Sequence, residues 1–113
     1  MHEMSIAQSI LDIVDEYMSN ENGGRLLEVA VEIGELTAVV PDSLTFCYEA
    51  LVEDSPYRDS KIRINVIPLS GTCSDCGKSF KIEKFEFLCP VCQSSGISVT
   101  GGQELRISHL EVD

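Results

Sequence analysis

Basic residues are scarce in this chain. Its 113 residues include 8 Lys and Arg against 19 Asp and Glu, which gives a formal charge of −11 at pH 7. A protein with this excess of negative charge is repelled by nucleic-acid phosphates. The sequence therefore predicts no nucleic-acid partner.

Long apolar runs are absent as well. Nowhere do 18 apolar residues follow one another, and no Lys- or Arg-rich stretch precedes an apolar one at the amino terminus. These absences argue against a membrane span and a signal peptide, so we expect a cytoplasmic protein with no membrane partner. The chain is also too short for two large folded units, which leaves one domain or one domain with a small module.

Motifs of hydrolytic enzymes are missing too. The chain has no Gly-rich phosphate loop, no Ser, His and Asp pattern of a catalytic triad, and no metal motif with an open coordination position. These absences argue against a hydrolytic enzyme.

Hydrophobic periodicity predicts two helices and a first strand. Residues 5–19 place apolar side chains three and four positions apart, which predicts an amphipathic helix starting at Ser5. A second helix is expected after Asp42 or Ser43, either of which could be its N-cap. Between them, residues 27–33 alternate strictly between apolar and polar. This predicts a half-buried strand whose core face carries Leu27, Val29, Val31 and Ile33.

Two further strands complete the expected sheet. Residues 62–66 alternate up to Pro68, and the last strand changes phase between Ile107 and Leu110, which a bulge near Ser108-His109 would explain. A strand, helix, strand order favours a parallel pair. We therefore expect an α+β fold: two helices packed on a small three-stranded mixed sheet, with a four-cysteine module inserted.

Four of the five cysteines form the strongest local pattern. Cys73-Ser74-Asp75-Cys76 and Cys89-Pro90-Val91-Cys92 are two Cys-x2-Cys pairs separated by twelve residues. Two such turns can supply the four tetrahedral thiolates of a closed, structural zinc site. The side chains of Phe80, Phe85, Phe87 and Leu88 are expected to form an apolar wall around it.

Other interpretations of these cysteines are open. They could form two surface disulfides or be free thiols, both of which the spacing and a cytoplasmic location disfavour. They could also form a rubredoxin-like iron site for electron transfer, which visible absorption would reveal. A zinc-ribbon interaction or transcription module is a further alternative, although it would need a basic surface. Away from the pairs, we expect Cys47 to be a buried small hydrophobe and His109 to be a hydrogen-bonded strand residue.

The first three residues could chelate a second metal. The terminal amine of Met1, the amide and imidazole nitrogens of His2 and the amide of Glu3 can close adjacent chelate rings in one plane. Four planar nitrogens suit Ni(II) or Cu(II) rather than zinc. The alternative is an ordinary exposed terminal histidine.

The chain as a whole resembles the HypA/HybF family of nickel metallochaperones of hydrogenase maturation. The resemblance rests on the two cysteine pairs together with Met1-His2-Glu3-Met4-Ser5, Ile33-Gly34-Glu35-Leu36, Val40-Pro41-Asp42-Ser43-Leu44, Phe46 and Gly102-Gln103-Glu104-Leu105. It implies an α/β nickel-binding domain, residues 1–69 plus 103–113, and a zinc-binding module, residues 70–102.

The resemblance also implies that the protein is not itself an enzyme, and it implies how such a protein works. Nickel would bind at Met1, His2 and Glu3, and zinc at Cys73, Cys76, Cys89 and Cys92. The nickel would pass to the large-subunit precursor of a [NiFe] hydrogenase, with the help of a nickel-binding GTPase, and some family members also assist urease. Whether the chain is a monomer or a homodimer stays open at this point.

Overall fold

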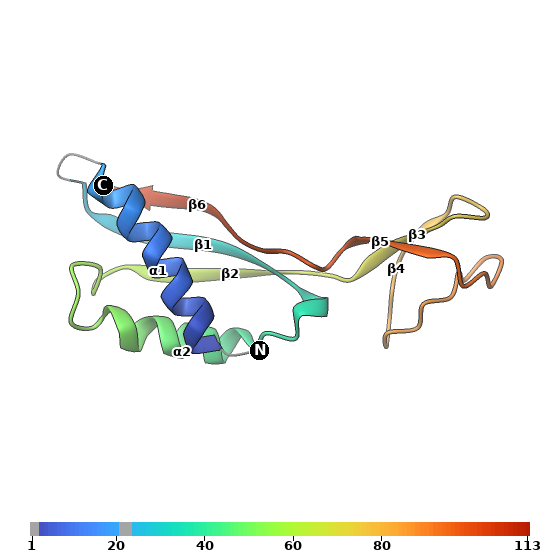
Figure 1. The fold of residues 1–113 in the computed structure, drawn as a ribbon, viewed down its shortest axis with the longest axis horizontal. Helices are drawn as coiled ribbons and strands as arrows, with labels where there is room; N and C mark the ends of the chain where they lie inside the picture. The colour runs from blue at the N-terminus through green and yellow to red at the C-terminus, as the bar shows by residue number, and fades with distance from the viewer. Residues whose placement is uncertain (1–2, 21–23) are drawn as a thin grey trace.

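Two small β-sheets lie end to end along an elongated molecule of 55 × 25 × 16 Å (Figure 1). The computed structural model describes residues 3–20 and 24–113. Its elements are α1 (Glu3–Ser19), β1 (Leu26–Gly34), the 3₁₀ helix η1 (Glu35–Thr37), α2 (Pro41–Val52), β2 (Lys61–Ile67), β3 (Ser70–Cys73), β4 (Ser79–Lys81), β5 (Ile97–Gly101) and β6 (Leu105–Val112). The first sheet has the strand order β2-β1-β6 and the second β4-β3-β5.

The first sheet is mixed, as expected. The central strand β1 runs parallel to β2 and antiparallel to β6. Ala30 pairs with His109 while its neighbour Val31 pairs with Ile107, so Ser108 is an extra residue in β6. The predicted parallel pair and the predicted bulge are both confirmed.

Helices α1 and α2 bury the apolar face of this sheet and form the main core. Fully or nearly fully buried residues come from α1 (Ile6, Ala7, Ile10, Leu11, Val14), from β1 (Val29, Val31, Ile33) and from α2 (Leu44, Tyr48, Val52). The hydroxyl of Tyr48 is hydrogen-bonded to the Ser60 hydroxyl at 2.6 Å, which satisfies the one polar atom of that side chain inside the core. The predicted α+β fold is confirmed.

The expected phase of β1 is wrong at its first residues. Leu27 was assigned to the core face, but it is 37% exposed, whereas Leu26 is 2% exposed. The pairing of β1 with β6 shifts between Leu26 and Glu28, so one residue is inserted there. Because side chains alternate between faces, a one-residue shift exchanges the buried and exposed positions.

Both helix starts also differ from the prediction. Helix α1 begins at Glu3, two residues before Ser5. Helix α2 begins at Pro41 with Val40 as its N-cap, and neither Asp42 nor Ser43 caps it. Proline is favoured at the first helical position because its fixed φ is helical and its missing N–H is not needed there.

Two connections, residues 68–69 and 102–104, join the two sheets, and the end of β1 with η1 lies against them; we call this region the neck (Figure 1). Gly34 N–H donates to Glu104 O at 2.7 Å, and Leu36 N–H donates to Gly102 O at 2.8 Å. The Glu35 carboxylate accepts the N–H of Leu69 at 3.0 Å. The segment that ends β1 is therefore fastened to both connections between the sheets.

The neck predicts a steric requirement for glycine at position 34. A Cβ on Gly34 would lie 2.1 Å from the carbonyl carbon and oxygen of Gly102, although the φ of Gly34 is an ordinary −73°. We expect Gly34→Ala to force the strands apart and to lower the free energy of unfolding by about 1–3 kcal/mol, as overpacking does. Chemical denaturation followed by circular dichroism would measure this loss, and an unchanged midpoint would contradict it. Gly77→Ala is the comparison, because a Cβ there meets no atom within 4 Å and only its φ of +76° opposes the change.

Candidate metal centres

Four thiols converge at the far end of the second sheet. The Sγ atoms of Cys73, Cys76, Cys89 and Cys92 all lie within 4.8 Å of one another. The Cys73–Cys92 and Cys76–Cys89 sulfur pairs are each 3.5 Å apart. Four Zn–S bonds of about 2.3 Å at tetrahedral angles place sulfurs about 3.8 Å apart, so the arrangement fits a zinc ion at its centre.

The two Cys-x2-Cys turns share one backbone design. In the first, Gly77 N–H donates to Cys73 O at 2.9 Å and Cys73 N–H donates to Lys78 O at 2.9 Å. In the second, Gln93 N–H donates to Cys89 O at 2.8 Å and Cys89 N–H donates to Ser94 O at 3.0 Å. Each turn is closed by a left-handed residue directly after its second cysteine.

The sequence indicates this left-handed residue in only one of the two turns. Gly77, with φ +76°, was recognisable because glycine tolerates this conformation, but Gln93 occupies the same position of the second turn with φ +61°. The turns are also tied to each other, since the Ser94 hydroxyl donates to the Asp75 carboxylate. The signal that could have found Gln93 is its equivalent place after a Cys-x2-Cys pair.

Backbone N–H groups point at the first sulfur of each pair. The N–H groups of Cys92 and Val91 lie 3.5 and 3.4 Å from the Cys89 sulfur, and in that order they lower the pKa of Cys89 to about 6. The N–H of Cys76 likewise lowers the pKa of Cys73. At the first cysteine of each pair, the backbone N–H groups therefore favour the thiolate, the form that binds a metal.

The second cysteine of each pair shows why a cation is needed. The Ser94 N–H lowers the pKa of Cys92, but the neighbouring thiols, Cys73 foremost, and desolvation outweigh it and raise that pKa to about 12. The pKa of Cys76 is also raised, because the thiol of Cys89 and desolvation outweigh the N–H of Lys78. Four sulfurs this close cannot all ionise by themselves, whereas a bound dication makes four thiolates favourable.

The expected aromatic wall around the sulfurs is wrong. Phe85, Phe87 and Leu88 are 58%, 38% and 54% exposed, and Phe80 is half-buried. Lys84 and Phe85 both have positive φ, in a tight turn closed by the hydrogen bond from Glu86 N–H to Glu83 O. Phe85 lines a surface pocket together with Glu35 and Leu69 of the neck. The buried side chains of this part of the molecule are instead Cys73, Ile82 and Cys89. Of these, Ile82 is tied to the neck, because its N–H donates to Leu69 O at 2.8 Å.

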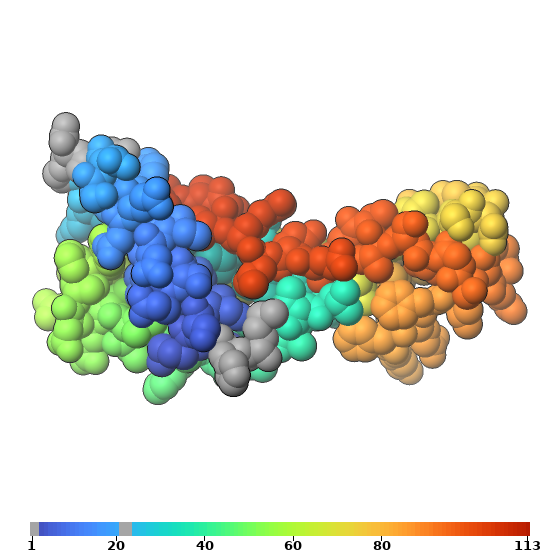
Figure 2. Space-filling model, viewed as in Figure 1, coloured from blue at the N-terminus to red at the C-terminus, as the bar shows by residue number. Residues whose placement is uncertain are grey.

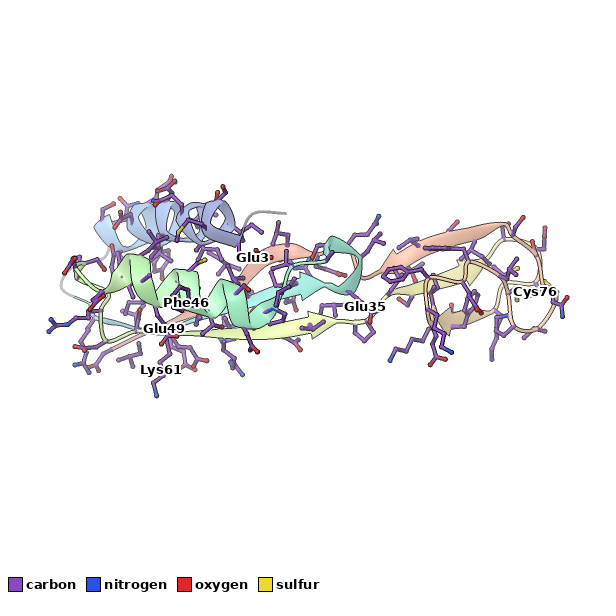
Figure 3. All side chains as sticks on the ribbon, turned by 90° about the horizontal axis from the view of Figure 1, so that it is seen from below. Glu3, Glu35, Phe46, Glu49, Lys61 and Cys76 are labelled. Carbon is purple, nitrogen blue, oxygen red and sulfur yellow. The ribbon has the colours of Figure 1, made fainter. Side chains whose placement is uncertain are left out.

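Of the three expected nickel ligands, Glu3 is the one within the described residues, and it lies in the half of the molecule that carries the first sheet (Figure 3). Met1 and His2 fall outside the described residues, and Glu3 is the first residue of α1 (Figure 3). One carboxylate oxygen of Glu3 accepts the N–H of Val40 at 3.2 Å.

The two remaining candidates have ordinary structural surroundings. Cys47 packs against the main core. His109 lies 3.2 Å from Arg63 through its Nε2 atom and 3.3 Å from the Ser108 hydroxyl through Nδ1. The expectation for His109 is confirmed, whereas Cys47, which was expected to be buried, is only half-buried. Within the described part of the chain, the four cysteines are the one cluster of metal-binding side chains. None of the described helices is long and apolar enough to span a bilayer.

The fold and the four-thiol site define a small metal-binding α+β protein. A family model described as "Hydrogenase/urease nickel incorporation, metallochaperone, hypA" matches residues 1–112. The chain therefore belongs to the HypA family of nickel metallochaperones, and the function expected from the sequence, nickel metallochaperone of hydrogenase maturation, is confirmed at this level.

Curated relatives match the chain along its full length. Hydrogenase maturation factor HypA of Geobacter metallireducens is 41% identical over 113 residues, with 100% of both chains covered. The factor of the same name from Desulfitobacterium hafniense is 32% identical and covers 100% of this chain and 99% of its own.

Solved structures agree with the fold. The solution structure of the Ni metallochaperone HypA from Helicobacter pylori has a TM-score of 0.67 at 27% identity and covers 98% of this chain and 97% of its own. A second structure, titled "Solution structure of HypA protein", has a TM-score of 0.72 at 27% identity, with 98% and 95% covered.

Proposed function

We propose that this chain carries Ni(II) at its amino terminus and delivers it, in the cytoplasm, to the large-subunit precursor of a [NiFe] hydrogenase. The ligands are the terminal amine of Met1, the amide and imidazole of His2 and the amide of Glu3. The match of a nickel-incorporation family over residues 1–112 carries this proposal. A nickel-binding GTPase is the proposed partner in the transfer, and the chain itself is proposed to associate into a homodimer.

The surroundings of Glu3 support an amide ligand. Its carboxylate already accepts the Val40 N–H, which fastens the start of α1 to the N-cap of α2. A deprotonated amide is also a stronger donor to planar nickel than a carboxylate oxygen. We therefore assign the Glu3 backbone nitrogen, rather than its side chain, to the metal.

Zinc is the proposed resident metal of the four cysteines. With four protein sulfurs, the site has no position for water or substrate, so bound zinc would supply structure rather than catalysis. The proposed division is an α/β nickel-binding domain, residues 1–69 plus 103–113, and a zinc-binding module, residues 70–102. Glu3 and Cys76 lie in different halves, so the two metals would be held far from each other (Figure 3).

Extending the chain by one residue before Met1 tests the nickel site. The extension removes the amine from its chelate ring while every side chain stays, so we expect nickel to bind at least about 100-fold more weakly. Calorimetric titration together with the absorption spectrum of planar Ni(II) would measure the change. The same residue added after Asp113 is the control and should leave binding intact. An extended chain with native affinity and spectrum would show that His2 binds nickel together with other side chains.

Acid should release the nickel. The terminal amine has a reference pKa of about 8 and imidazole of about 6.5, and the two amides must lose protons when they bind the metal. Protons therefore compete with nickel at every ligand, and affinity should fall continuously as pH decreases through this range. Nickel titration at a series of pH values would check that affinity falls as the pH falls. A histidine acting alone would show this decrease only near its own pKa.

A further inference from the structure

An apolar groove lies open between α1 and β6 on the helix-covered side of the first sheet. Its volume is about 440 Å³, and its walls include Ile10 and Ile13 of α1, Val31 of β1, and Leu105 and Ile107 of β6. Ile13 is 55% exposed and Leu105 is 44% exposed. Figure 2 shows this side, with α1 beside β6. The helices thus cover β1 more fully than they cover β6.

The same region contains an open sheet edge. β6 is the last strand in the order β2-β1-β6 and pairs only with β1 among the described strands. The outer side of an edge strand presents N–H and C=O groups that can pair with another strand. A partner strand here would also extend the floor of the groove.

The sequence of β6 is complementary to itself. It reads Leu-Arg-Ile-Ser-His-Leu-Glu-Val from Leu105 to Val112. When two copies run antiparallel about the point between Ser108 and His109, Ile107 faces Leu110 of the second copy, and Leu105 faces its Val112. Arg106 then faces Glu111 of the second copy, and this ion pair forms twice.

The bulge at Ser108 puts the matching residues of the two halves of β6 on the same face of the sheet. Ile107 and Leu110 both pack on the helix-covered side, although they are an odd number of residues apart. Arg106 and Glu111 both lie on the opposite side, where their partners in β1 are Glu32 and Glu28. Without the extra residue, the apolar and charged positions of one half of β6 would face the wrong side.

We propose that two copies of this chain associate through their β6 edges about a two-fold axis perpendicular to the sheet. The product is a continuous six-stranded sheet in which the two α1 helices lie side by side and close both grooves. The four central strands span about 14 Å at spacings of about 4.8 Å, and packed helices lie about 8–10 Å apart, so two helices fit over these strands. This inference specifies the surface of the homodimer proposed above and is independent of nickel binding.

Charge decides both the specificity and the salt dependence of this association. Arg106 holds Glu32 through Nε at 2.6 Å, and its remaining guanidinium N–H groups can bind Glu111 of the second copy. Each copy also carries a formal charge of −11, so the two repel each other at long range. Salt screens this repulsion, and the dimer should therefore become tighter when salt is added.

Charge exchange in the zinc-loaded full chain tests the proposal. In a dimer of either variant, Arg106→Glu or Glu111→Arg, positions 106 and 111 of the two copies carry the same charge at both contacts. This repulsion should weaken association at least about tenfold. An equimolar mixture of the two variants should restore a heterodimer, because both contacts then join opposite charges. Analytical ultracentrifugation of each variant and of the mixture would measure the dissociation constants.

Arg58→Glu is the matched control. It makes the same charge reversal at an exposed residue in the turn between α2 and β2, next to the strand at the opposite edge of the sheet. It should leave the dimer intact. A monomeric wild type at all salt concentrations, unchanged association of Arg106→Glu, or a mixture that stays monomeric would each overturn the proposal. Nickel titration of the same samples reports separately on the amino-terminal site.

Discussion

Replacing Cys76 with Ser should remove the zinc and unfold residues 70–102, while the α/β half stays folded. Zinc binding to such modules contributes about 10 kcal/mol or more of folding free energy. Its loss cannot be offset locally, because the buried side chains of this segment are Cys73, Ile82 and Cys89, two of which are themselves ligands. Cys76 is exposed, so the substitution removes little packing and its effect reports on the metal.

Two measurements check this result. Metal analysis should fall from one zinc per chain to none, and amide exchange should lose protection in β3, β4 and β5 but not in β1. Cys47→Ser is the control: it changes the one cysteine outside the cluster, which packs on the main core, and should keep full zinc. A Cys76→Ser chain with one zinc and a protected second sheet would exclude a structural role.

Replacing His2 with Ala should abolish nickel binding without changing the fold or the zinc. The imidazole closes one chelate ring, and its removal should weaken nickel binding by more than about 100-fold, since even groups that only support a metal ligand contribute 10–100-fold. The main core begins at Ile6 in α1, so no loss of stability is expected from a change at position 2.

The second histidine of the chain provides the control for this experiment. His109→Ala removes the one other imidazole, which contacts Arg63 and Ser108 on the sheet. Its nickel titration should match that of the wild type, and unfolding curves of both variants would confirm intact folds. Equal nickel curves for wild type and His2→Ala would instead move the search to His109 or the cysteines.

Local chemistry made most of the fold predictable. Alternation identified β1 and β2, and the change of phase after Ile107 identified the bulge because both halves of β6 keep an apolar face. The Cys-x2-Cys spacing predicted the four-thiol cluster, since two residues between cysteines already bring both sulfurs to one point. These features depend on neighbours in sequence.

Features set by contacts distant in sequence were not predictable. The register shift at Leu26 depends on how β6 pairs with β1. The left-handed conformation of Lys84 and Phe85 could not be predicted, because neither residue is a glycine or an asparagine. The contact of the Glu35 carboxylate with Leu69 joins residues 34 positions apart. Nothing in the local sequence around either residue indicates this partner.

The neck also changes the entropy of metal binding. Leu69 and Gly102 are in close contact, since a Cβ on Gly102 would lie 2.6 Å from the Leu69 Cα, and the next residues, Ser70 and Gly101, pair as strands. The α/β half thus holds both ends of a segment of about 30 residues together before any metal arrives. Closing a loop of that length costs about 3 kcal/mol in a free chain. Zinc binding therefore does not have to supply this loop-closure free energy. The free energy of the four Zn–S bonds can instead order the segment itself.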